Sequence, residues 1–587
     1  MSRAPDVVIV VPPFAGIDRP SLGAHVLQTV ATEQNFYVKV LYANIVFASL
    51  IGEIAYTTIS TYPPLSLLGE RLFATEVHGK SFPDVEELVE RTTSASKLLG
   101  LAGPVTLDRN FFVSAAQQLG DIVVALLENL NPSIIGFSST FEQTNSALAL
   151  IRRLRPRFPQ KPFIIGGANC EGEMAKGIAA LMPEVDFIFS GESEETFVSF
   201  LKSFQGNVLN RNRIIDGTPL RNLEALPTND YDDYFQMFDE YLPKSTIRQT
   251  GNQSITYETS RGCWWGAKHH CTFCGLNGGG MAFREKNALK VLRDFDLLAA
   301  KHGLKKIILV DNIMPAGYFE TLLPALKGKG FDLFYEQKAN LSLEKVRLLK
   351  AAGIDRIQPL STPQLKAMKK GTSARQNISL LRYARACGLS LSWNMLHGVP
   401  FEERDWYSEV AVFLPLLQHL EPPTGLSPIS IDRFSPYFQR PGEFGLSNRR
   451  PHPSYALAFP SSANLDELAY HFVADRPEGL ADDDPIFVGL RETIALWKER
   501  WAPRASPPML HLIDDGNHLI LLDTRDVSGS PFTLVLPEQG RAILSEHSPQ
   551  AAKEWCIERR YAIVINDEYI PLATASAELL ATAQRLN

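Results

Sequence analysis

The residues with the clearest chemical potential are three cysteines that crowd into twelve positions: Cys263, Cys271 and Cys274, in the stretch CWWGAKHHCTFC. A loop with this spacing can hold thiolates on three corners of a cubane iron–sulfur cluster. Cys271 and Cys274 can bind two irons from one turn, and the seven intervening residues let Cys263 reach a third. The fourth iron then has no protein ligand, which leaves it open to chemistry.

An open iron can be chelated by the amino and carboxylate groups of S-adenosylmethionine (SAM), and an electron from the cluster can then break a sulfonium C–S bond. The same residues also fit a zinc site in which His269 or His270 completes a tetrahedron. We favour the cluster because the motif follows an expected barrel strand and the chain has the length of a large enzyme. Trp264, Trp265 and Phe273 either pack this loop or shield the cluster.

Length and composition bound the class of protein. The 587 residues suggest about three domains, and the 45% hydrophobic and 21% charged residues are ordinary for a globular protein. The net charge of -7 without a basic stripe predicts no nucleic-acid partner. We expect a cytoplasmic protein, because no signal peptide, no apolar run of membrane-spanning length and no disulfide pattern is present.

The segment 1–225 alternates short apolar runs with helix-length stretches. Its expected strands are DVVIVV, YVKVLYAN, SIIGFSST, KPFIIGGA and VDFIFSGE. This alternation predicts a Rossmann-like α/β domain whose parallel sheet is covered on both faces. Ligands of such sheets bind outside the carboxyl ends of the strands. Those ends carry small or turn-forming residues that let a ligand approach the backbone: Pro12–Pro13, Ser138–Thr140, Gly166–Gly167 and Gly191–Glu192.

The remaining chain predicts three further parts. Residues 226–252 are polar and aromatic and are expected to form a linker. Residues 253–460 repeat βα units, which predicts a partial TIM barrel with its site at the carboxyl ends of the strands. The expected strands of this part are SITYETS, KKIILVDN, DLFYEQK, IDRIQPL, LSLSWNM and ISIDRFSP. Residues 461–587 predict a small α+β, winged-helix-like module with a hairpin turn at Asn566–Asp567.

The cysteine stretch and its surroundings resemble the radical SAM proteins of the ribosomal-peptide (RiPP) maturation C-methyltransferase family, a branch with a cobalamin-binding domain. The resemblance runs through much of the chain, in VPPFAGIDRPSLGAHVLQ, IIGFSSTFEQTNSALAL, DFIFSGESEE, ETSRGCWWGAKHHCTFCGLNG and WNMLHGVP. A seven-residue gap between the first two cysteines is specific to this branch, whereas the commoner radical SAM spacing has three residues there.

The resemblance implies a [4Fe-4S] cluster with SAM in the barrel and a cobalamin in the first domain. It places the cobalamin against Ser138, Thr140, Gln143, Gly166, Gly167 and Gly191. No Asp-x-His-x-x-Gly motif occurs, so we expect no histidine ligand beneath the cobalt; His25 and His78 are the only histidines of that segment.

Polar residues at the expected barrel strand ends are candidates for contact with SAM or the substrate, or they simply solvate those ends. Those assigned to cofactor binding are Asp311, Asn312, Lys338 and Asn394, together with Phe273 beside the cluster. The candidate catalytic residues are Glu336 and Tyr437.

The resemblance favours cobalamin-dependent C-methylation of a peptide or small-molecule acceptor, with electrons from a reductant such as flavodoxin or ferredoxin. A second hypothesis is transfer of the 3-amino-3-carboxypropyl group of SAM to a heteroatom, as in the arsinothricin-biosynthesis branch, where trivalent arsenic is the acceptor. It is motivated by IQPLSTPQ, which lacks the Gly-Ile-Glu-Ser stretch of relatives, and by GVPFEE in place of Gly-Phe-Pro-Gly-Glu. A third is a non-catalytic cobalamin- or metal-binding module.

Overall fold

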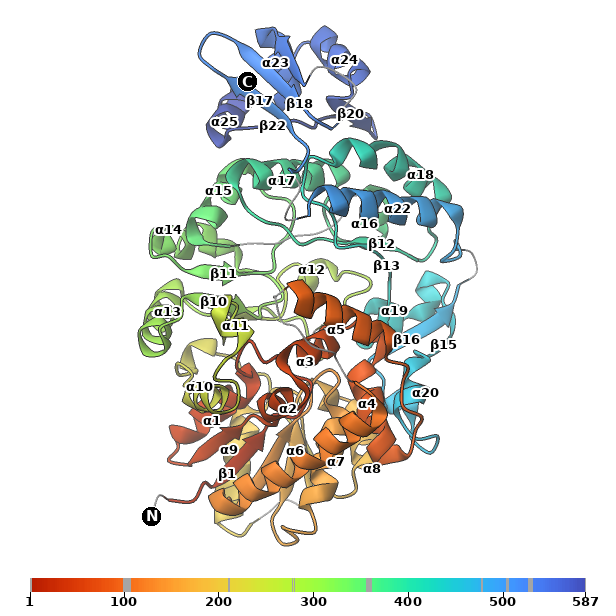
Figure 1. Ribbon diagram of the computed structural model, residues 1–587. Helices are drawn as coiled ribbons and strands as arrows, with labels where there is room; N and C mark the ends of the chain where they lie inside the picture. The colour runs from red at the N-terminus through yellow and green to blue at the C-terminus, as the bar shows by residue number, and fades with distance from the viewer. Residues whose placement is uncertain are drawn as a thin grey trace.

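The computed structural model of the chain describes residues 3–98, 107–208, 212–276, 278, 280–354, 362–476, 479–502, 506–525 and 531–585. Figure 1 shows three layers along the long axis of the molecule. The N-terminal sheet and its helices lie at the bottom of the view, the βα units coloured green lie in the middle, and the C-terminal module in blue lies at the top.

The first layer contains a six-stranded sheet in the order β2-β1-β3-β4-β5-β6, and all its strands are parallel. The parallel α/β sheet expected from the sequence is therefore confirmed, with one more strand than expected, β6. The chain passes from β1 to β2 on one side and returns to β3 on the other, so a topological switch point lies between β1 and β3, where such sheets bind ligands. The strands are β1 (Val7–Val10), β2 (Val38–Leu41), β3 (Ile134–Ser138), β4 (Phe163–Gly166), β5 (Phe187–Ser190) and β6 (Ile214–Asp216).

Apolar helices cover this sheet. Helix α1 (Leu22–Thr32) packs against α9 (Glu194–Gln205), and α6 (Arg109–Leu130) packs against α2 (Ala43–Ile51) and α7 (Thr144–Leu154). Helix α6, and α2 taken together with the helix that follows it, are long and apolar enough by composition to cross a membrane. Core helices pass the same test, and α6 places residues such as Phe112, Leu119 and Leu127 in the core, so this is weak evidence for a span.

The expected linker, residues 226–252, contains two helices, α10 (Asp232–Tyr241) and α11 (Thr246–Gln249). Helix α10 packs against β2 and α2. The Asp233 carboxylate accepts hydrogen bonds from the backbone N–H of Val40 and the amide of Gln28, both at 2.8 Å. The hydroxyl of Tyr234 donates to the carbonyl of Ile17 at 2.9 Å. This segment is thus an integral part of the first layer rather than a free connector.

The middle layer is built from βα units. Strands β7 (Ile255–Tyr257), β10 (Lys306–Leu309) and β11 (Asp332–Phe334) form one parallel sheet, with α13 (Ala288–His302) preceding β10. Strands β12 (Met395–His397) and β13 (Leu426–Pro428) form a second parallel pair. In the described parts of the chain these two sheets are not joined by strand pairing, and the strand expected at 354–360 lies almost wholly outside them. The partial barrel therefore stays a prediction.

The C-terminal segment divides between two layers. Helix α22 (Pro485–Arg500) packs against α18 (Arg404–Phe413) of the middle layer, where Trp497 meets Trp393 with ring centroids 6.0 Å apart. A compact α+β module begins at β17 (Leu510–Asp514). The expected hairpin is confirmed: β20 (Ala562–Ile565) pairs with β21 (Glu568–Pro571), and Asn566 and Asp567 both have positive φ, as a type I′ turn requires.

Two glutamates, one buried and one half-buried, cap neighbouring helices of the first layer. Glu70, at the start of α4 (Leu68–His78), accepts hydrogen bonds from the backbone N–H groups of Thr144 and Asn145 at 2.8 and 2.7 Å, where α7 begins. Glu142, just before α7, accepts one from the N–H of Gly69 at 2.5 Å. Burial raises the pKa of Glu70 to about 7 and that of Glu142 to about 8, and repulsion between the two adds to the second.

This pair predicts a pH dependence of stability. Because both pKa values lie above the usual 4.5, the folded protein binds more protons than the unfolded chain between about pH 4.5 and 8, so stability falls as the pH rises through that window. We expect Glu142→Gln to reduce this decline, measured as the unfolding midpoint from pH 5 to 8.5. Exposed Glu90→Gln should keep the wild-type slope; an unchanged slope in Glu142→Gln would contradict the account.

Candidate functional site

The cysteine loop starts from a short strand, β8 (Ser260–Arg261), and includes the helical turn α12 (Gly266–His269). Gly262 has a φ of 80°, and a Cβ there would collide with the carbonyl oxygen of Ala282, so only glycine fits. The backbone N–H of Ala267 donates to the Cys263 carbonyl at 2.8 Å. The N–H of Cys274 donates to the Cys271 carbonyl at 3.1 Å, which closes the turn that presents these two thiols.

The two tryptophans anchor this loop to its surroundings. The indole N–H of Trp264 donates to the Met314 carbonyl at 3.1 Å, and that of Trp265 donates to the Lys369 carbonyl at 3.0 Å. The ammonium of Lys338 lies 3.1 Å from the ring centroid of Trp265, a cation–π contact. Trp265 also lines the cavity described next, so it both packs the loop and forms part of the cavity wall.

All three cysteines line one cavity of about 490 Å³, here called the cysteine cavity. The structure brings to it five further residues that the sequence singled out: Phe273, Asp311, Asn312, Glu336 and Lys338. Sequence reasoning missed other residues of its lining: Arg19, which comes from the first layer, and Gln337, Lys370 and Thr372.

Charged groups in this cavity have distinct surroundings. Asp311 is buried, and its carboxylate accepts hydrogen bonds from the N–H and hydroxyl of Thr259 and from the hydroxyl of Ser260, so it holds the chain that leads into the cysteine loop. Burial raises its pKa to about 6. Burial also lowers the pKa of the Lys338 ammonium to about 8. Asp311 thus positions the loop, while Lys338 contributes positive charge to the cavity wall.

Three predicted residues lie outside the cavities that they were assigned to. Tyr437 is 1% exposed, packs against Phe444 in the core, and its backbone N–H donates to the Thr272 carbonyl of the cysteine loop at 3.1 Å. The amide of Asn394 donates to the Ser427 hydroxyl at 3.0 Å, away from the cysteine cavity. Gln143 accepts from the N–H and hydroxyl of Thr140 and donates to the Pro12 carbonyl at 2.6 Å, so it braces the sheet edge.

The spread of the thiols separates a cluster from a single zinc ion. Ligand sulfurs around one tetrahedral zinc lie about 4 Å apart. Among the residues that the structure describes, only Asp230, Asp232 and His302 form a trio of ligand atoms within 4.8 Å of one another. The ring Nε2 of His270 lies 2.9 Å from the Cys274 carbonyl, to which it donates, and His269 stacks on Trp265. The thiols therefore fit separate corners of a cube better than one ion.

A second cavity of about 310 Å³, the sheet cavity, lies at the carboxyl edge of the parallel sheet. Its lining includes five residues expected at the cobalamin: Ser138, Thr140, Gly166, Gly167 and Gly191. A Cβ at Gly191 would meet nothing within 4 Å, which leaves room for a ligand beside the backbone. Ser138 Oγ and Glu194 Oε2 are buried and have no hydrogen-bond partner within the described ranges, so the cavity offers polar atoms to a ligand.

Carboxylates already occupy or flank the helix N-termini near the sheet cavity. Dinucleotide pyrophosphates in such folds bind free N–H groups at helix N-termini. Here Glu70 occupies the N-terminus of α7, and α9 begins with Glu194 and Glu195. This sheet edge is therefore a poor site for the pyrophosphate of a dinucleotide. His25 is buried with both ring nitrogens bonded, to Gln28 and Tyr42, so it is not available as a ligand.

A third cavity of about 450 Å³, the junction cavity, lies next to the other two. It shares Gly191, Glu192, Glu258 and Arg261 with the sheet cavity, and Leu276, Val310 and Asn312 with the cysteine cavity. The three cavities therefore follow one another from the sheet edge to the thiols, in what is here called the path.

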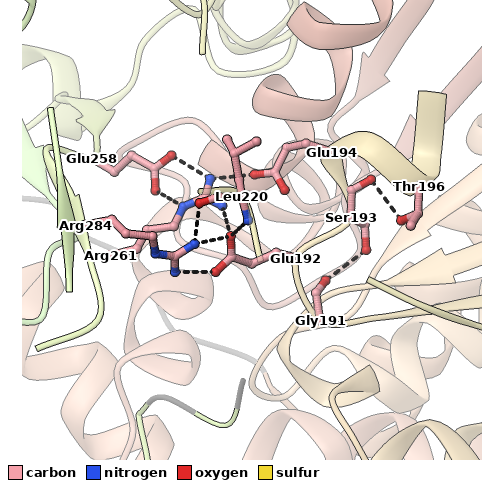
Figure 2. A network of polar contacts seen from close by, with 9 residues as sticks. All are labelled: Gly191, Glu192, Ser193, Glu194, Thr196, Leu220, Glu258, Arg261 and Arg284. Carbon is pink, nitrogen blue, oxygen red and sulfur yellow. Dashed lines mark hydrogen bonds and ion pairs between the residues drawn. The ribbon is translucent and has the colours of Figure 1, made fainter. Parts of the chain in front are cut away.

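An ion network lines this path (Figure 2). Arg261 donates to Glu192 at 2.7 Å, to Glu194 at 2.5 Å and, through two nitrogens, to Glu258 at 2.8 Å. Arg284, its partner across β8 and β9 (Arg284–Glu285), binds Glu192 with both terminal nitrogens. Sequence reasoning missed this network, although its residues other than Arg284 stand in the same short motifs, SGESEE and ETSRGC, as the predicted ones.

Comparisons with solved structures find the same fold in two enzymes. The cobalamin-dependent SAM radical enzyme OxsB, with aqua-cobalamin and SAM bound, is 15% identical with a TM-score of 0.53, over 81% of this chain and 65% of that chain. The radical SAM methyltransferase TsrM from Kitasatospora setae, with tryptophan and a SAM analogue bound, is 15% identical with a TM-score of 0.50, over 83% of this chain and 89% of that chain. A second TsrM structure, with cobalamin and a [4Fe-4S] cluster bound, is 14% identical with the same TM-score.

At such low sequence identity, these structural likenesses show the fold of this chain and not its activity. The chain spans about two thirds of the length of OxsB. No protein-family model matches the sequence, and no curated protein matches it.

The thiol geometry predicts the outcome of cysteine replacement. We expect serine at Cys263, Cys271 or Cys274 to remove most of the iron and labile sulfide from anaerobically reconstituted protein, because each thiolate binds a different iron. Cys387→Ser, at a half-buried cysteine away from this loop, should keep the wild-type iron content. The assignment of these cysteines to an iron–sulfur cluster would be contradicted if the wild type bound zinc in place of iron, or if all three variants kept their full iron content.

Proposed function

We propose that this chain is a cobalamin-dependent radical SAM methyltransferase that methylates a carbon atom of a peptide or small natural product. The observation that carries this proposal is the row of three neighbouring cavities that runs from one lined by the three clustered cysteines to one at the carboxyl edge of a parallel sheet. The fold shared with OxsB and TsrM supports it.

In this proposal the cysteine cavity holds the cluster and SAM. When bound, the cluster and SAM supply one-electron cleavage of a C–S bond, and cobalamin supplies the methyl group. The chain contributes charges of both signs to SAM: Lys338 and Lys370 suit its carboxylate, and Glu336 suits its amino or hydroxyl groups. Phe273 and Phe334 in the same wall exclude water from the reacting atoms.

The sheet cavity holds the cobalamin. Ser138 offers an unpaired hydroxyl, and Gly166 and Gly191 present backbone without side chains. No histidine lines this cavity in the described residues. The acceptor then occupies the junction cavity, and electrons come from a cytoplasmic reductant such as flavodoxin or ferredoxin.

The aminocarboxypropyl hypothesis gains no support from the described residues. The main reason for this hypothesis is the missing Gly-Ile-Glu-Ser stretch at IQPLS. That segment lies outside the described residues, since residues 355–361 are not described. The second departure, GVPFEE, forms a turn in which the N–H groups of Gly398 and Val399 donate to the Glu402 carboxylate at 2.6 and 3.1 Å. None of these residues lines the cysteine cavity, so this change does not reach the SAM site.

The by-products of SAM distinguish the two reactions. With anaerobic reconstituted protein, SAM, dithionite, hydroxocobalamin and acceptor, we expect both 5′-deoxyadenosine and S-adenosylhomocysteine, because one SAM is cleaved and another is demethylated. Chromatography with mass detection measures both. The matched control omits cobalamin and should yield 5′-deoxyadenosine without methylated product. Accumulation of methylthioadenosine, or full methylation without cobalamin, would contradict the proposal.

A further inference from the structure

Glu194 stands between the sheet cavity and the cysteine loop. It is the first residue of α9, it is 8% exposed, and it lines the sheet cavity. One carboxylate oxygen, Oε1, accepts a hydrogen bond from Arg261 at 2.5 Å. The other, Oε2, is buried with no partner in the described part of the chain. Figure 2 shows the carboxylate at the edge of the ion network.

Arg261 links this carboxylate to the chain segment that carries the cysteines. It lies two residues before Cys263, and its guanidinium is fixed by Glu258 from its own layer and by Glu192 from the first layer. Because the guanidinium is planar and always charged, these bonds set its orientation as well as its position. A ligand that fixes Glu194 is therefore fixed relative to the cysteine loop.

The unpartnered oxygen indicates the chemistry of that ligand. A buried carboxylate oxygen without a donor is costly, and a ligand that supplies a donor removes the cost. The network holds three carboxylates, Glu192, Glu194 and Glu258, against two guanidiniums, those of Arg261 and Arg284. Lys286 adds a buried cation near Glu258, so the charges of this region nearly balance. The free Oε2 of Glu194 can only accept, so the site suits an N–H donor.

We propose that Glu194 is a cofactor-positioning residue, whose Oε2 accepts a hydrogen bond from a carboxamide N–H on the rim of the corrinoid while its Oε1 holds Arg261 beside the cysteine loop. This inference rests on the proposed function, because a corrinoid rim is the source of neutral carboxamide donors in that proposal. It adds a residue to the sheet cavity that neither the sequence motifs nor the fold comparison assigned.

The first test is the affinity for hydroxocobalamin, measured by absorbance titration of the wild type, Glu194→Gln and Glu195→Gln. In Glu194→Gln the amide oxygen stays on Arg261 and an NH₂ group turns to the cavity, so a charge-assisted bond is lost and the Kd should rise about tenfold. Glu195 is on the same helical turn but exposed, so Glu195→Gln should bind like the wild type.

The second test has a readout that a merely structural role would not move. It uses cobalamin derivatives in which one side-chain carboxamide is hydrolysed to a carboxylic acid. The wild type should bind one of these derivatives at least tenfold more weakly than the others, because the new carboxylate of that derivative lies against the carboxylate of Glu194. Glu194→Gln should recover most of this loss for the same derivative, because an NH₂ group can donate to the new carboxylate.

The outcomes separate the two levels of the proposal. If the wild type does not bind hydroxocobalamin, the proposed function fails and this inference fails with it. If the wild type binds but Glu194→Gln binds equally well, the inference alone is overturned. It is also overturned if the wild type, whose folding is not in question, binds every acid derivative with one common affinity.

Discussion

The ion network around Arg261 is the interaction on which the relation between the two proposed cofactor sites depends. Its glutamates at positions 192 and 194 belong to the sheet layer, whereas Glu258, Arg261 and Arg284 belong to the layer that carries the cysteines. The side chains of this network are only 8–25% exposed. Removing either guanidinium from such a poorly hydrated set leaves carboxylates without their counter-charge, which makes the geometry of the set hard to vary. The network thus fixes the sheet edge against the start of the cysteine loop.

The three cavities differ in what they offer a ligand. The sheet cavity combines apolar walls and open glycine backbone with unpaired acceptors, and internal carboxylates occupy or flank its helix N-termini. The cysteine cavity has lysines and acidic residues in one wall beside the thiols. A large cofactor rich in amide groups suits the first, and a sulfonium nucleoside with amino and carboxylate groups suits the second. This difference between neighbouring cavities supports the proposed two-cofactor enzyme over a zinc protein or a simple binding module.

Much of the site could be predicted from the sequence because its signals are local. The five expected strands formed because runs such as DVVIVV and SIIGFSST are buried on both faces. Gly166, Gly191 and Ser138 were found because they stand where those strands end, and Asp311 and Asn312 were found in the same way after β10. Short and weakly apolar β6, IID, gave no such signal.

The missed features depend on partners distant in sequence. Arg261 and Glu194 are 67 positions apart, so nothing in either motif indicates that they meet. Gln143 was assigned to cobalamin and Tyr437 to catalysis from motif position alone, but Gln143 is bonded to Pro12 and Tyr437 packs in the core. The stretch LSLSWNM was expected to form a strand, yet pairing begins only at Met395, where β13 lies alongside. Such outcomes are decided by tertiary neighbours rather than by local periodicity.

The central claim is a four-iron cluster with one iron left free for SAM. Mössbauer spectroscopy of ⁵⁷Fe-reconstituted protein before and after addition of SAM tests it most directly. The account predicts a cubane spectrum in which a minor component, the iron without a cysteine ligand, shifts when SAM is added while the remainder stays unchanged. The account would be contradicted by a spectrum without a cubane cluster, or by a cubane spectrum in which no iron component changes when SAM is added.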